Sequence, residues 1–169
     1  SHLDSQPTGG KFDGAYGVMV GLEILRVLTD HEHITEAPIE VVSWTNEEGA
    51  RFPPAMLGSG VFGGEFSLED GLGARAQDGT LLVDELTRIG YSGSDPCGSR
   101  PVGYYLEPHI EQGPILEASD ISVGIVTGVQ GIRWYDVSIR GVESHAAGGA
   151  ARRRRGHAPL ARTALARAR

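Results

Sequence analysis

The sequence predicts an α/β fold, in which helices connect the strands of a mainly parallel sheet. Apolar residues recur at helical spacing after residue 13, and short β-branched or alternating segments follow at residues 39–44, 104–110, 123–129 and 133–140. A helix that joins two strands through short connections forms the βαβ unit of such sheets. The 169 residues are 40% hydrophobic and 22% charged, which is ordinary globular composition and indicates one main domain.

The expected helix begins after Asp13, which stands at the N-cap position. Its apolar face is formed by Ala15, Val18, Leu22, Leu25 and Leu28. Residues 39–44 are short and β-branched, as in a buried strand, and further helices are expected near residues 59–62 and 81–89. The first strand of the βαβ unit would lie before Ser1, so we expect the sequence to be a fragment.

Composition excludes several classes of protein. No run of about 18 uncharged apolar residues occurs, which argues against a membrane span. The single cysteine, Cys97, and the lack of a secretory signal favour the cytoplasm. All 22 acidic residues precede Ala151, whereas seven of the 15 basic residues follow it. Such an acidic body argues against nucleic acid as a partner.

Two histidine–carboxylate segments and an acidic pair carry possible chemistry. In an extended segment His2 and Asp4 face the same side, so Asp4 could fix the tautomer of a metal-bound His2 ring. An expression-tag remnant at Ser1-His2 explains the same residues equally well. Glu47 and Glu48 directly follow the strand at 39–44. One of them could ligate a metal while the other acts as general base, although an isolated acidic pair is more often a solvated turn.

Three further residues complete the candidate set. Asp13 could bridge two cations with both oxygens, or it could simply cap the helix. His109 lies at the end of the strand predicted at residues 104–110 and adds a second imidazole, although a lone histidine there is more often structural. Mixed His, Asp and Glu ligation suits Zn²⁺, and also Mn²⁺ or Co²⁺. His145 could donate a hydrogen bond to a developing oxyanion, or it is a surface residue at a turn.

Taken together, four motifs in order resemble the amidase/hydantoinase/carbamoylase family of binuclear metal-dependent amidohydrolases, which are related to the zinc aminopeptidases. The motifs are His2-x-Asp4, Gly10-Lys11-Phe12-Asp13-Gly14, Asn46-Glu47-Glu48-Gly49-x-Arg51-Phe52 and His109-Ile110-Glu111-Gln112-Gly113. The resemblance covers residues 1–149. It implies a partial zinc-aminopeptidase-like catalytic domain at residues 1–124, followed at residues 125–149 by the first strands of an α+β lid or dimerisation domain.

The resemblance also implies a role for each metal ligand. His2 and His109 would bind one divalent metal ion, Glu48 would bind the other, and Asp13 would bridge the two. Zinc is the expected metal, with manganese or cobalt as alternatives. The family's second metal needs a further histidine far downstream, and His157 does not match it.

Catalytic and substrate-binding roles follow from the same resemblance. Glu47 would be the general base that acts on a metal-activated water, and Asp4 would orient His2. Gln112 and His145 would contact the substrate, an N-carbamoyl-L-amino acid or a ureido acid such as allantoate. Family members of full length form homodimers, so a homodimer is implied as well.

The basic tail at residues 150–169 departs from the family pattern. It contains little besides arginine and alanine, and we interpret it as disordered or translated out of frame. A nucleic-acid or membrane arm is the alternative reading. Two alternatives to the amidohydrolase function stay open. The 169-residue chain could be a non-catalytic remnant of such an amidohydrolase, or the protein could be a dipeptidase of the same superfamily.

Overall fold

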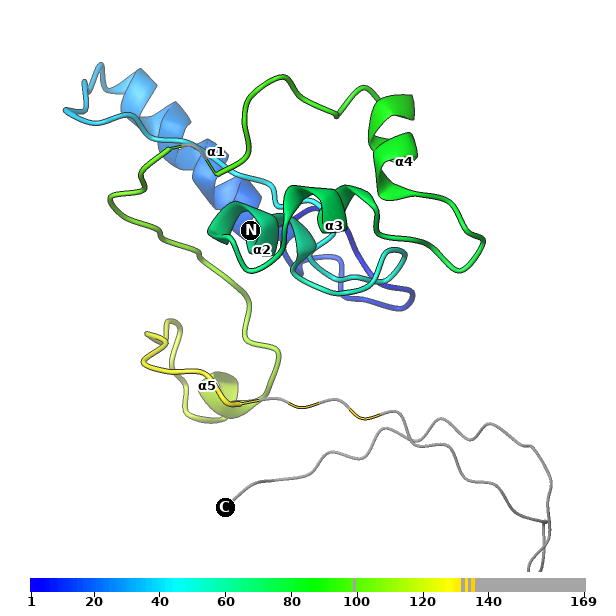
Figure 1. The fold of residues 1–169 in the computed structure, drawn as a ribbon. Helices are drawn as coiled ribbons and strands as arrows, with labels where there is room; N and C mark the ends of the chain where they lie inside the picture. The colour runs from blue at the N-terminus through cyan, green and yellow to red at the C-terminus, as the bar shows by residue number, and fades with distance from the viewer. Residues whose placement is uncertain (99, 132, 134, 136–169) are drawn as a thin grey trace, which may run out of the picture. The chain divides into compact units, whose positions relative to one another are not determined.

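A computed structural model describes residues 1–98, 100–131, 133 and 135 of the chain. The chain divides into two units, Ser1–Ser119 and Asp120–Arg169. Every helix of the described residues lies in the first unit (Figure 1). The candidate site residues from His2 to Gln112 lie in this first unit as well.

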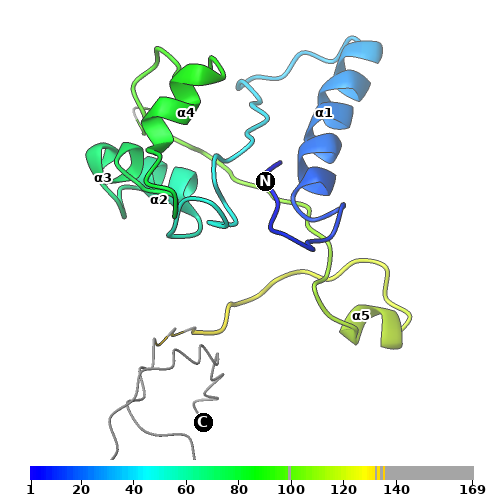
Figure 2. The same cartoon turned by 90° about the vertical axis from the view of Figure 1, so that its right-hand side faces the viewer.

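Helix α1, Ala15–Asp30, confirms the helix predicted from apolar spacing. The predicted N-cap residue, Asp13, is wrong. Gly14, with φ 68°, occupies the N-cap position, and no side chain caps the helix. Glycine adopts this left-handed conformation without steric cost. The carboxylate of Asp13 is thus free to make other contacts. Figure 2 shows α1 on one side of the N-terminal segment and helices α2 to α4 on the other.

Helices α2, Leu57–Gly63, and α4, Leu82–Arg88, confirm the two further helices expected from the sequence. The short helices α3, Leu68–Leu72, and α5, Ile115–Ala118, were not predicted. Ser67 caps α3, since its Oγ accepts a hydrogen bond of 3.0 Å from the backbone N–H of Asp70. No helix in the described part of the chain has both the length and the apolar character needed to cross a membrane.

A small apolar core joins helices α2 and α4. Its buried members are Phe52, Leu57, Ala76 and Leu82, and the partly buried Phe66, Ala74 and Leu86 pack against them. Nearby, the rings of Trp44 and Phe62 pack at 5.3 Å between centroids. This core fixes the position of the loop between residue 44 and α2.

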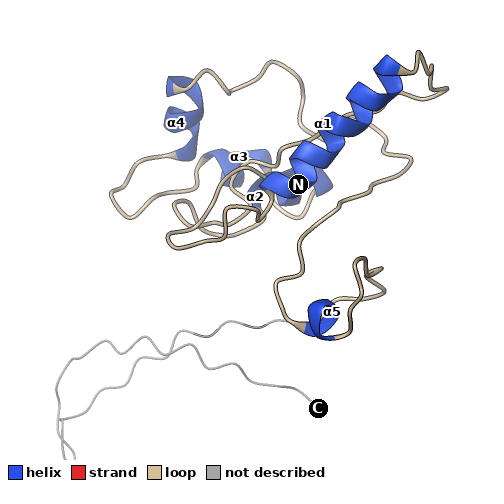
Figure 3. Cartoon of the chain, turned by 180° about the vertical axis from the view of Figure 1, so that it is seen from behind, coloured by secondary structure: helices blue, strands red, loops and turns tan. Residues whose placement is uncertain are grey.

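The predicted strands are wrong as paired elements within the described residues, which Figure 3 draws as helices and loops. Two isolated bridges occur there, a parallel one between His2 and Trp44 and an antiparallel one between Arg75 and Leu81. Residues 104–110 and 123–129 are not in strands. A strand exists only where a neighbouring backbone supplies hydrogen bonds, which β-propensity does not provide. The strand expected at 133–140 lies outside the described residues, apart from residues 133 and 135.

Candidate metal centre

The parallel bridge brings the N-terminal segment beside the end of the segment at residues 39–44. The backbone N–H of Trp44 donates to the carbonyl oxygen of Ser1 at 2.7 Å. His2 is the paired residue, and only 2% of it is exposed. His2 and Asp4 are therefore held next to the acidic residues that follow Trp44.

One hydrogen bond fixes the tautomer of His2. Its Nδ1 lies 2.9 Å from the backbone carbonyl oxygen of Asp4. A carbonyl can only accept, so Nδ1 carries the proton and Nε2 presents a lone pair. The expected partner was the Asp4 carboxylate, and this detail is corrected: its Oδ1 lies 3.6 Å from Nδ1, beyond hydrogen-bond distance.

The carboxylate of Asp4 instead holds the acidic turn. Its Oδ1 accepts the backbone N–H of Glu47 at 3.1 Å, and its Oδ2 accepts the backbone N–H of Glu48 at 3.0 Å. Hydrogen bonds to an ionised acceptor are stronger than neutral ones. Asp4 therefore contacts the His2 imidazole through its main-chain carbonyl and the acidic pair through its carboxylate.

Asp13 is contacted from the segment that contains His109. The Nδ1 atom of His109 donates to the carbonyl oxygen of Ile110 at 2.8 Å, which leaves Nε2 with a lone pair. That Nε2 lies 3.2 Å from Oδ1 of Asp13. Gln112 donates from Nε2 to Oδ2 of the same carboxylate at 2.7 Å. The two oxygens of Asp13 thus have different environments.

Several carboxylate oxygens and imidazole nitrogens lie close together at this point. Oδ1 of Asp13 and Oε1 of Glu48 are buried and have no hydrogen-bond partner. His2 Nε2 lies 3.8 Å from Asp13 Oδ1 and 3.4 Å from Glu47 Oε2. A buried, unpaired acceptor is costly unless a cation or a proton compensates it.

The donor atoms form two groups that share His2. One group contains His2, Asp13 and His109, and the other contains His2, Glu47 and Glu48; within each, the candidate ligand atoms lie within 4.8 Å of one another. Imidazole nitrogens with carboxylate oxygens are a donor set that Zn²⁺ accepts. The residues fit divalent cations because their unpaired acceptors point at common positions.

The electrostatics of the centre act most strongly on Glu47. Burial raises the pKa of its carboxyl group above the ordinary value, and the negative charges of Glu48, Asp4 and Asp13 raise it further. His2 opposes this shift. A carboxylate whose pKa is raised is a better proton acceptor near neutral pH.

Two glycines permit the close approach of α1, and sequence reasoning gave neither of them a role. A Cβ at Gly14 would lie 2.5 Å from ring atoms of His2. A Cβ at Gly17 would lie 2.5 Å from the carbonyl oxygen of Pro108. The motif that places Gly14 directly after Asp13 could have indicated the role of Gly14. No sequence pattern indicated the role of Gly17.

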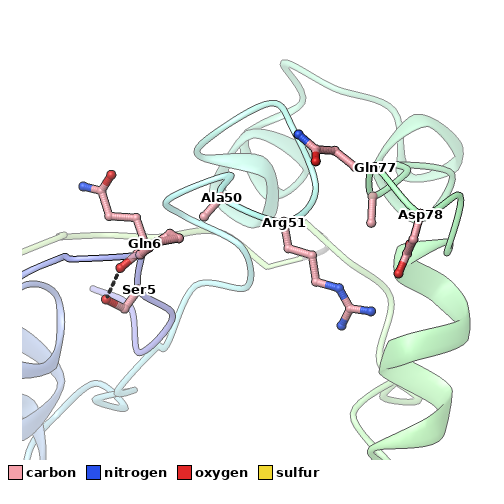
Figure 4. A pocket seen from close by; sticks show the side chains of 8 residues that line it. Ser5, Gln6, Ala50, Arg51, Gln77 and Asp78 are labelled. Atoms are coloured by element: carbon pink, nitrogen blue, oxygen red, sulfur yellow. Dashed lines mark hydrogen bonds between the residues drawn. The ribbon is translucent and has the colours of Figure 1, made fainter.

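An open pocket of about 490 Å³ lies beside the acidic turn (Figure 4). Its lining residues are Ser5, Gln6, Pro7, Ala50, Arg51, Ala76, Gln77 and Asp78. None of these is a member of the two donor groups, so the pocket and the metal centre are separate features. Arg51 pairs with Glu85 at 2.7 Å.

The structure brings most of the expected site residues into one cluster. These are His2, Asp4, Asp13, Glu47, Glu48, His109 and Gln112. His145 lies outside the described residues. Asn46, a buried residue of the acidic motif, was not expected to contribute, and its position before two acidic residues carries no local signal of burial.

Comparison with known proteins shows which family the chain matches. The sequence model of Peptidase family M20/M25/M40 matches residues 1–166, further than the resemblance to residue 149. An N-carbamoyl-L-amino-acid amidohydrolase of Rhizobium meliloti is 52% identical over 145 residues, which cover 86% of this chain and 35% of that protein. An allantoate amidohydrolase of Bacillus subtilis is 36% identical over 148 residues, covering 86% and 36%.

A solved structure of an amidase also resembles this chain. A hydantoinase/carbamoylase family amidase from Burkholderia ambifaria matches with a TM-score of 0.77 and 52% identity, covering 89% of this chain and 36% of that one. The chain belongs to Peptidase family M20/M25/M40. This confirms the predicted fold class, a partial zinc-aminopeptidase-like domain, although its described residues contain little strand. The chain spans about a third of the length of the curated relatives it matches.

Proposed function

We propose that the protein to which these residues belong hydrolyses the C–N bond of a linear carbamoyl or ureido substrate with the help of two divalent cations. The observation that carries this proposal is the buried cluster of unpaired acceptors around His2, in which Oδ1 of Asp13 and Oε1 of Glu48 lack hydrogen-bond partners. Both are lone-pair donors of the kind that bind divalent metals.

Each cation has its own protein ligands in this proposal. His2 and His109 would hold one, Glu48 would hold the other, and Asp13 would bridge them. Zinc fits the mixed imidazole and carboxylate donors, with manganese or cobalt as alternatives. When bound, such cations polarise a substrate carbonyl and lower the pKa of water.

Glu47 is the general base. It takes the proton of the attacking water and returns it to the departing nitrogen, a role that its raised pKa supports. Asp4 holds the turn that carries Glu47, through the two backbone hydrogen bonds of its carboxylate. Gln112 uses its amide N–H on Asp13, which leaves its carbonyl oxygen available to a substrate. His145 would face the substrate carbonyl from the lid.

The relatives favour N-carbamoyl-L-amino acids as the substrates. Relatives named for that activity include one that is 52% identical and others that are 35–41% identical, whereas an allantoate amidohydrolase is 36% identical. Both names describe hydrolysis of a urea-type group on a small acid. A homodimer and a cytoplasmic location belong to the same proposal.

An assay of substrate cleavage tests this function, with ammonia release followed for the carbamoyl and ureido substrates and the newly formed amino group followed for the dipeptide. The longest natural polypeptide that contains these residues is incubated with zinc and an N-carbamoyl-L-amino acid, allantoate or a dipeptide. We expect turnover of the carbamoyl substrate. Glu47→Gln should lower kcat by about 10²- to 10⁴-fold, because it removes the general base. Glu65→Gln is the matched control for loss of one carboxylate, since Glu65 lies outside the cluster.

The alternatives give different results in the same assay. Cleavage of the dipeptide alone would assign the protein to the dipeptidases, and an inert, metal-loaded polypeptide would refute the hydrolase. The 169-residue chain is assayed in parallel. Turnover by that chain would contradict the hypothesis that it is a non-catalytic remnant.

A further inference from the structure

Asn46 immediately precedes the acidic pair and is buried, with 9% of its surface exposed. Its backbone is left-handed, with φ 55°. Its side-chain Nδ2 donates to the carbonyl oxygen of Phe52 at 2.6 Å and to that of Pro54 at 3.4 Å. Asparagine is one of the few residues besides glycine that tolerates this backbone conformation, so one side chain meets two requirements here.

The backbone on either side of Asn46 makes hydrogen bonds to two other segments of the chain. The carbonyl oxygens of residues 45–47 accept hydrogen bonds of 2.6–3.3 Å from the backbone N–H groups of residues 56–58. The N–H groups of Glu47 and Glu48 donate to the carboxylate of Asp4. The amide of Asn46 is the contact that ties the turn to the loop at residues 52–54. Without it, the buried carbonyl group of Phe52 and the partly buried one of Pro54 would lose this donor.

The two glutamate side chains depend on this backbone for their direction. Within the part of the chain that the structure describes, neither carboxylate receives a hydrogen bond, and Oε1 of Glu48 is buried without one. Oε2 of Glu47 nevertheless lies 3.4 Å from Nε2 of His2. Their placement therefore comes from the backbone of the turn.

We propose that Asn46 is a positioning residue, whose side-chain amide sets the backbone of the turn so that Glu47 and Glu48 face the metal centre. The inference rests on the proposed function, because it takes the centre to be a binding site for divalent cations. Asn46 touches neither substrate nor metal and acts only through the two glutamates.

Two substitutions separate the hydrogen bonds from the backbone conformation. Asn46→Asp keeps the size and the tolerance of a left-handed backbone but removes the donor. Asn46→Gly relieves the backbone and also removes the donor. If the donor matters, both variants weaken binding of Co²⁺, which is followed by its visible absorption, by about 10- to 100-fold. Both should also speed amide hydrogen exchange at residues 47 and 48, with exchange in α1 unchanged.

Ser67→Ala provides the control. It removes the cap of α3, so it should destabilise the fold without changing the affinity for Co²⁺. The proposal is overturned if Asn46→Gly binds Co²⁺ as the wild type does, since the conformation alone would then explain the asparagine. It is also overturned if the Gly variant fails to fold, because the role would then be global.

Failure of the proposed function gives a distinct result. If the wild-type chain binds no Co²⁺, the metal centre is refuted. Hydrogen exchange at residues 47 and 48 still decides the role of Asn46 in that case, because it needs no metal. Unchanged exchange in both variants would refute that role.

Discussion

Gln112 and Asp13 are 99 positions apart in the sequence, and Nε2 of Gln112 donates a hydrogen bond of 2.7 Å to Oδ2 of Asp13. This bond leaves Oδ1 of the carboxylate facing Nε2 of His109 at 3.2 Å. The amide of Gln112 therefore decides which oxygen of Asp13 is presented to the two imidazoles.

Replacing Gln112 by methionine tests this orientation. Gln112→Met keeps the length of the side chain but removes the donor, so the carboxylate of Asp13 is free to rotate. We expect the affinity for Zn²⁺ to fall by about 10- to 100-fold, as for other residues that orient metal ligands. Calorimetric titration measures the change. Gln77→Met, an exposed substitution outside the cluster, should bind Zn²⁺ as the wild type does.

Addition of Zn²⁺ should stabilise the chain. The cluster holds several negative groups with unpaired acceptors, and a cation that binds only the folded state shifts the equilibrium toward it. At a free concentration of 100 times Kd, the gain in unfolding free energy is about 2.7 kcal/mol. Thermal unfolding with and without a chelator measures it. Asp13→Ala should abolish the shift, and a shift that survives this substitution would place the cation elsewhere.

Gly14→Ala should disturb His2 as well as the backbone. The backbone of Gly14, with φ 68° and ψ −50°, lies in a sparsely populated region that costs a non-glycine residue about 1–3 kcal/mol. The added Cβ would also lie 2.5 Å from the His2 ring and displace it. Gly64→Ala is the matched control, because it has φ 83° and open space around the new atom. Denaturant unfolding should show a loss in both variants, while only Gly14→Ala should weaken Zn²⁺ binding.

The ion pairs of Glu85 predict a pH-dependent contribution to stability. Hydrogen bonds from Arg88 and Arg51 lower the pKa of Glu85 from 4.5 to about 2. A carboxyl group whose pKa is lower in the folded state stabilises that state above its unfolded pKa. This contribution should be complete above pH 4.5 and disappear as the pH falls from 4.5 towards 2.

Comparison of Glu85→Gln with the wild type over this pH range checks the prediction. Their difference in unfolding free energy should be largest near neutral pH and shrink in acid. Both arginines are exposed, so added salt should also reduce it. Asp84→Asn, on the same helix, controls for the loss of a charge. A difference that persists unchanged at pH 3 would contradict the assigned ion pairs.

The cluster of candidate ligands was predictable because several motifs occur together in the sequence. A histidine two residues before an aspartate, or two adjacent glutamates after an apolar segment, has an ordinary explanation when taken alone, and only their co-occurrence and the family resemblance indicated metal chemistry. Helices α1, α2 and α4 were predictable because the apolar spacing of a helix lies within one segment.

The strands and the hydrogen-bond partners were not predictable in the same way. Pairing of residues 39–44 depends on which backbone lies beside them, and only Trp44 has a bridge. For Asp4, the sequence indicated a contact with His2, but it could not tell the main-chain oxygen from the carboxylate. The burial of Asn46 depends on the loop that folds over it from residues 52–54.

His2 belongs to both donor groups, but Nε2 is the one ring nitrogen that it can offer, because Nδ1 is used on the carbonyl oxygen of Asp4. A single lone pair binds one cation, so the two groups compete for this ring. In the proposed centre His2 serves the cation that His109 also holds, and chemical modification of the ring should empty that position first. Any attempt to re-engineer metal preference in this family should therefore leave His2 untouched and vary Glu48, which belongs to the other position.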